Sequence, residues 1–146
     1  MNGKNKHDVS GSEQVSLQEN FWLSSYALSR HWKSDLTFFE DELQFFRLLI
    51  DKHLSILRSP EATNPVNRLL ANITELEAQR HVLLKKIGRH VQYIEIFVEN
   101  PFVQNAQDCK DEHERLESAF ADFVKTFRNV KAEVLTMTEA VLRSRK

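Results

Sequence analysis

Apolar side chains recur at alternating steps of three and four residues in three long segments of this chain. Such spacing keeps an apolar line on one side of an α-helix, and its repetition over several heptads is typical of long helices packed side by side. The three lines are Trp32, Leu36, Phe39, Leu43, Phe46, Ile50, His53 and Leu57; Val66, Leu69, Ile73, Leu76, Arg80, Leu83, Ile87, His90, Ile94 and Phe97; and Phe102, Ala106, Cys109, His113, Leu116, Phe120, Phe123, Phe127, Val130, Val134, Met137 and Val141. The sequence therefore predicts an all-α protein.

Proline and asparagine indicate where two of these helices begin. Asn64 precedes Pro65, and Asn100 precedes Pro101, which is the pattern of an N-cap followed by proline in the first helical turn. The expected helices span residues 16–57, 65–98 and 102–144. Because the turns between them are short, we expect an elongated, up-down-up antiparallel three-helix bundle about 50 to 60 Å long.

Residues 15–146 are expected to form one domain after a disordered polar tail at residues 1–14. The weakest helical stretch lies at residues 24–35, where three serines lower the helix propensity. A break near Ser34 would divide the first helix and give four helices, which is the alternative architecture. Gly88 is the one glycine inside an expected helix, where it either permits a close approach or marks a hinge.

Charge and composition exclude several classes of function. The formal net charge is −1, which gives no long-range attraction to nucleic acid or to anionic lipid, so neither is an expected partner. With 3 glycines, the chain lacks material for phosphate-binding loops. It has no long apolar run, no signal-peptide pattern and a single cysteine, Cys109, and we expect a cytoplasmic protein.

Charges predict the register of the bundle. When the first two helices fold back on each other, the acidic residues 40–42 come level with Arg80 and His81. In the same way, Glu112, Glu114 and Glu117 come level with Lys85, Lys86 and Arg89. A basic middle helix between two acidic stretches favours this pairing.

The first helix carries more apolar residues than one packing line needs. Phe38 and Phe45 lie on one flank and Leu49 on another, where a helix of an isolated bundle is usually polar. Such a surplus favours burial by residues 16–30 folded back as a fourth helix, by a second copy of the chain or by another helical protein. The predicted function is therefore a non-enzymatic interaction or assembly module that self-associates through this flank, with no catalytic residues and no cofactor.

Polar residues within the packing lines give the alternative function. The expected register brings His90 and His113 to the level of His31 and Asp35, close to Cys109 and Trp32. Imidazole and carboxylate groups are ligands for zinc, iron or manganese. The alternative is thus a metal- or small-ligand-binding bundle that uses His31, Asp35, His90 and His113, although the Glu-x-x-His signature of di-iron bundles is absent.

Overall fold

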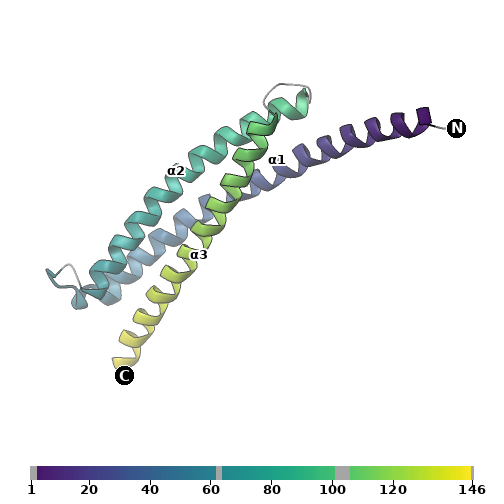
Figure 1. The fold of residues 1–146 in the computed structure, drawn as a ribbon. Coiled ribbons are helices and arrows are strands. Elements are labelled where there is room, and N and C mark those ends of the chain that lie inside the picture. Colours follow the sequence, from purple (N-terminus) through teal and green to yellow (C-terminus); the bar gives the residue numbers. More distant parts are fainter. Residues whose placement is uncertain (1–2, 62–63, 101–105, 146) are drawn as a thin grey trace.

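The computed structural model describes residues 3–61, 64–100 and 106–145, with side chains described from residue 20 onward. Three long helices make up the fold: α1 (Gly3–Leu49), α2 (Pro65–Glu99) and α3 (Ala106–Ser144). Two short elements follow α1, a π-helical turn η1 (Ile50–Leu54) and a 3-10 turn η2 (Ser55–Leu57). The described residues contain no strand, and the all-α three-helix fold predicted from the sequence is confirmed (Figure 1).

α1 is longer than predicted and is not interrupted. It passes through Ser34 without a break, so the four-helix alternative is wrong. It also begins at Gly3, so residues 3–14 are helical where the sequence predicts a disordered tail. Once a helix is anchored, each added residue gains a backbone hydrogen bond without a new nucleation cost, and α1 extends past the ends of α2 and α3 (Figure 1).

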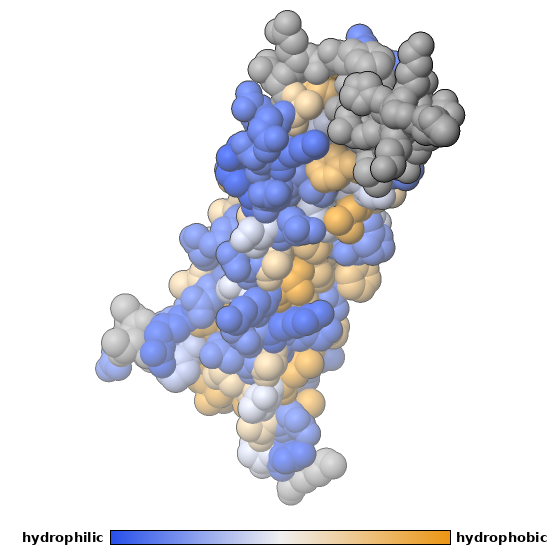
Figure 2. All heavy atoms as spheres, turned by 45° about the vertical axis from the view of Figure 1, so that its right-hand side comes forward, coloured by the Kyte–Doolittle hydropathy of each residue, from blue (hydrophilic) through white to orange (hydrophobic). Residues whose placement is uncertain are grey.

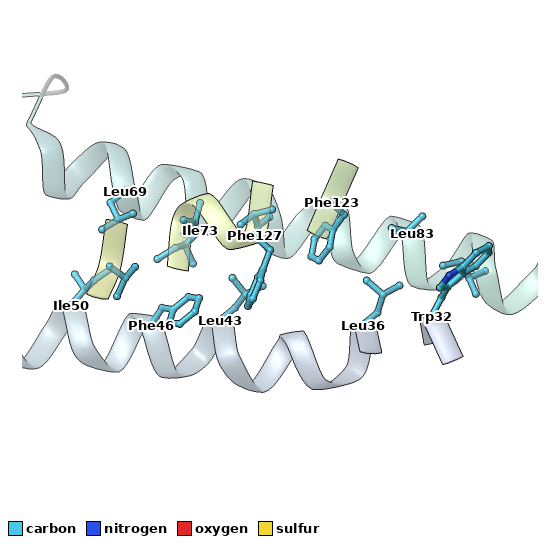
Figure 3. Close-up of a cluster of buried hydrophobic side chains, with 14 of the residues drawn as sticks. Trp32, Leu36, Leu43, Phe46, Ile50, Leu69, Ile73, Leu83, Phe123 and Phe127 are labelled. Atoms are coloured by element: carbon cyan, nitrogen blue, oxygen red, sulfur yellow. The ribbon is translucent and has the colours of Figure 1, made fainter. Parts of the chain in front are cut away.

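The principal core lies where the three apolar lines meet. Leu43 and Phe46 of α1 lie beside Ile73 of α2 and Phe127 of α3, and Trp32 lies toward the other end of the same buried cluster (Figure 3). The rings of Phe46 and Phe127 lie 5.6 Å apart. These contacts follow from the three-and-four spacing of the sequence, which places each residue of the line on the inner side of its helix.

A second core cluster lies nearer the beginning of α1, where the sequence analysis placed no packing line. Trp22 is 1% exposed and stacks on Phe97 at 4.6 Å between ring centroids, and Cys109 packs in the same cluster. Ser25 and Ser29 are also buried. They continue the line between Trp22 and Trp32, so the serines belong to the packed side of a continuous helix.

The end of α1 departs from the predicted spacing. The sequence line runs from Ile50 to His53 and Leu57, whereas the structure buries Leu54 and leaves Leu57 46% exposed. The reason is the π-helical turn η1, whose wider turn keeps residues four apart on the same side of the helix. Ile50 and Leu54 therefore both face the core.

The predicted N-cap of α2 is confirmed. The Asn64 Oδ1 atom accepts hydrogen bonds from the backbone N–H groups of Val66 and Asn67, at 3.0 and 3.1 Å, and Pro65 occupies the first turn. Asn100 stands at the carboxyl end of α2, where its N–H donates to the Ile96 carbonyl. Its predicted role at the start of α3 involves residues 101–105, which lie outside the described part of the chain.

Charged groups fix the register of α1 against its neighbours. Arg80, in the packing line of α2, donates to the Leu36 carbonyl at 3.3 Å and lies 3.5 Å from the Glu40 carboxylate. Arg47 forms two hydrogen bonds with Glu77. The predicted pairing of residues 40–42 with α2 is thus confirmed at Glu40.

The remaining charges follow the predicted pairing less closely. Glu42 pairs with Lys131 of α3 at 3.2 Å and not with α2. Glu112 bonds to Arg115 on its own helix, and not to the basic residues of α2 that the sequence analysis placed level with it. Within the described residues, none of the helices has a stretch long and apolar enough to cross a bilayer.

Candidate functional site

His90 and His113 are brought together as the sequence predicts. They project from facing positions of α2 and α3, and only 4% and 7% of their surfaces are exposed. The His90 Nε2 and His113 Nδ1 atoms lie 2.9 Å apart, so one imidazole donates a hydrogen bond to the other. Each ring thereby satisfies a buried polar atom of its neighbour.

Aromatic side chains cover the His113 side of this pair. Trp32 stacks on His113 with 5.0 Å between ring centroids, and Phe21 approaches the same ring edge-on at 6.1 Å. Burial and the nearby His113 together lower the pKa of His90 to about 4, although Glu112 opposes the shift. Burial also lowers the pKa of His113. Both rings are therefore neutral at pH 7, and in that state one ring nitrogen donates its proton to the unprotonated nitrogen of the other ring.

His31 and Asp35 do not join the pair. The His31 side chain is 71% exposed and lies 3.9 Å from the Asp35 carboxylate on the outer side of α1. Its neighbour Trp32 takes the inward position, so His31, one residue earlier on the helix, points away from the bundle. No group of three or more His, Cys, Asp or Glu side chains suited to a metal ion occurs among the described residues. The predicted four-residue metal site is therefore not assembled in this structure.

Cys109 lies one helical turn before His113 and is buried. Burial raises the pKa of its thiol to about 11, with a further contribution from Glu112. The thiol is therefore protonated at pH 7 and lacks the thiolate character of a nucleophile. A groove beside it is lined by Lys86, Arg89, His90, Tyr93, Asp108, Cys109, Glu112 and Arg115.

The second candidate site is the flank of α1 that faces away from the bundle. Phe38 is 59% exposed and Phe45 is 53% exposed, as expected for a surface left open by the three helices. Leu49 is partly buried and packs against the core, whereas Leu48 is 65% exposed. Sequence reasoning missed Leu48, although its position three residues after Phe45 is a signal that could have found it.

Two charged residues lie along the same flank. Asp41 lies between Phe38 and Phe45 in sequence, and Lys52 follows Leu48 by four residues; both are exposed. We call the set Phe38, Asp41, Phe45, Leu48 and Lys52 the α1 outer face. Phe38, Asp41, Phe45 and Leu48 lie on α1, and Lys52 lies on the π-helical turn η1 that continues it. In sequence the five members are three, four, three and four residues apart.

Comparisons with known proteins place no further constraint on this site, since no family model, curated protein or solved structure matches the chain.

Proposed function

We propose that this protein is a helical assembly module that self-associates through the α1 outer face. The observation that carries the proposal is the exposure of Phe38, Phe45 and Leu48, each more than half exposed, on one side of a single helix. Large apolar side chains grouped in this way are typical of protein interaction sites. A two-fold axis covers the same face on both copies without any additional element.

Other exposed apolar residues also support self-association. Apolar residues interrupt the hydrophilic surface along the length of the molecule in the view of Figure 2. Ile56, in the 3-10 turn η2, is 82% exposed. Exposed apolar side chains therefore occur from the middle of α1 to the turn before α2.

A non-enzymatic role agrees with the chemistry of the buried groups. The two buried imidazoles bond to each other and are neutral, and Cys109 holds a protonated thiol. Activated nucleophiles and general bases instead need a partner that shifts their pKa toward the working pH. The free thiol of the only cysteine also agrees with the proposed cytoplasmic location, because reducing compartments maintain thiols.

Sedimentation velocity at several protein concentrations tests self-association. We expect the mass to move from 17.1 kDa toward twice that value as the concentration rises. Phe38→Glu and Phe45→Glu should each shift the protein to monomer, because the interface would bury an unpaired charge. Val82→Glu on α2, where the wild-type residue is similarly exposed at 51%, is the matched control and should leave the mass unchanged.

A wild-type mass of 17.1 kDa at every concentration would contradict the proposal. Native mass spectrometry of the same sample, purified without an affinity tag, also tests the alternative function. About one equivalent of bound metal would favour the histidine site over the assembly module.

A further inference from the structure

We infer that two copies of the chain pair through the α1 outer face in antiparallel orientation, with Asp41 of each copy opposite the partner's Lys52. This inference rests on the proposed self-association and adds its orientation and register. It follows from the spacing of the face, from its charges and from the contacts of the neighbouring charges.

The part of the α1 outer face from Asp41 to Lys52 has the same spacing in both chain directions. From Asp41 to Phe45, Leu48 and Lys52 the steps are four, three and four residues. A second helix that runs the opposite way presents the same steps in the same order. Phe45 then meets the partner's Leu48, Leu48 meets the partner's Phe45, and the two charged positions flank these contacts. Phe38 lies one helical turn beyond Asp41, where it extends the interface.

The charges distinguish the two orientations. A parallel two-fold pair sets Asp41 beside the partner's Asp41 and Lys52 beside the partner's Lys52, and both contacts are repulsive. The antiparallel pair replaces them with two contacts between Asp41 and Lys52. Opposite charges at such flanking positions set the partner orientation of paired helices.

Asp41 and Lys52 are also available for such contacts. Within the described residues, neither side chain forms a hydrogen bond or an ion pair, and both are exposed. Their neighbours differ, since Glu40 pairs with Arg80, Glu42 pairs with Lys131, and Arg47 pairs with Glu77. Those three charges contact neighbouring helices, whereas the side chains of Asp41 and Lys52 have no such partner among the described residues.

Charge reversal tests the register. Asp41→Lys and Lys52→Asp should each raise the dimer dissociation constant about tenfold, because each makes two like-charge contacts per dimer. The double variant Asp41→Lys/Lys52→Asp should restore the wild-type constant to within about threefold. A double variant that dimerises no better than the single variants would overturn the inference.

Cysteine cross-linking gives a second, independent test. In a Cys109→Ala background, oxidation of an equimolar mixture of Asp41→Cys protein and Lys52→Cys protein should yield a covalent heterodimer. Neither protein oxidised alone should yield a covalent dimer, whereas the parallel pair requires that both do. In the double variant Asp41→Cys/Lys52→Cys the two positions of one chain lie about 16 Å apart, too far for an internal disulfide, so covalent dimer is expected there as well.

The control is Asp122→Cys/Glu133→Cys in the same background, which places two exposed cysteines at the same separation on α3. It should remain uncross-linked. Failure of the two proposals can be told apart, because a protein that sediments only as a monomer contradicts self-association itself. A dimer that cross-links in each single variant, or in neither the mixture nor the double variant, overturns only the antiparallel register.

Discussion

The buried histidine pair favours the folded chain most when both rings are uncharged. One hydrogen bond joins His90 to His113, and Trp32 stacks on the His113 ring. Protonation of either ring would place a charge in this buried layer. A group whose folded-state pKa is depressed binds protons more weakly in the folded than in the unfolded chain. The free energy of unfolding therefore falls as the pH drops below the unfolded pKa of about 6.5 and stops falling, for His90, near pH 4.

We predict that His90 alone lowers the free energy of unfolding by about 2 kcal/mol between pH 7 and pH 5. Thermal unfolding followed by circular dichroism at several pH values in this range measures the slope of the free energy of unfolding against pH. The variant His90→Leu/His113→Leu should show a flatter slope and equal or higher stability at pH 5, because the apolar side chains take no proton. His81→Gln, which replaces an exposed histidine of α2, should keep the wild-type slope; an equal slope in all three proteins would contradict the prediction.

The sequence predicted part of this residue-level picture. The antiparallel register placed His90 beside His113 because both stand in packing lines whose spacing is regular. It did not predict the inward positions of Ser25 and Ser29, since a hydroxyl side chain carries no apolar signal and burial there depends on the fit between helices. The same lack of signal hid the role of Trp22, which stood apart from the apolar line that began at Trp32.

At the scale of the elements, capping is the feature that the sequence determined best. Asn64 and Pro65 locate the beginning of α2 because few residue types satisfy the first backbone N–H groups of a helix. The π-helical turn η1 could not be predicted in this way. Leu54 and Leu57 are both leucine, and which of them faces the core depends on how α1 meets α2 and α3 at that level.

Removal of the α2 cap should destabilise the protein measurably. We expect Asn64→Ala to lower the free energy of unfolding by about 1 kcal/mol, because Val66 and Asn67 lose the acceptor of their backbone N–H groups. The side chain also donates to the Leu57 carbonyl at 3.0 Å, so the turn after η2 is loosened as well. Urea unfolding measures the change; Asn72→Ala, at an exposed interior position of α2, should cause no loss, and an equal loss in both would contradict the capping role.

Gly88 offers a stabilising substitution within α2. A Cβ atom added at this position would meet no atom within 4 Å, so the close approach considered from the sequence does not require glycine there. We predict that Gly88→Ala raises the free energy of unfolding by about 0.5 to 1 kcal/mol through helix propensity and a less flexible unfolded chain. A lower melting temperature in the variant would indicate instead that glycine serves a bend or a movement of α2.

At the scale of the whole molecule, two sides of α1 carry the same three-and-four spacing. One side builds the core with α2 and α3, and the other is the α1 outer face. The sequence predicted this surplus of apolar residues because it exceeds what one packing line needs, and it named Phe38 and Phe45 correctly as exposed. The sequence did not indicate which of Leu48 and Leu49 is exposed. Adjacent residues lie about 100° apart around a helix, so the angle at which α1 crosses its neighbours decides which of the two is covered.

Self-association should also make thermal stability depend on concentration. Because dimerisation favours the folded chain, we predict that the melting temperature rises as protein concentration is increased a hundredfold. Differential scanning calorimetry on wild type and Phe45→Glu measures the effect, and the variant should show no dependence. A wild-type melting temperature that does not change with concentration would argue against a dimer in this range.

The two core clusters each contain one of the two tryptophans of the chain, Trp22 in the smaller cluster and Trp32 in the larger. The protein therefore carries an intrinsic fluorophore in each half of its interior. With Trp22→Phe, emission reports on the layer beside His113, and with Trp32→Phe it reports on the stack against Phe97. Two single-tryptophan proteins would thus reveal whether the halves of this rod lose their packing in one cooperative step or one after the other.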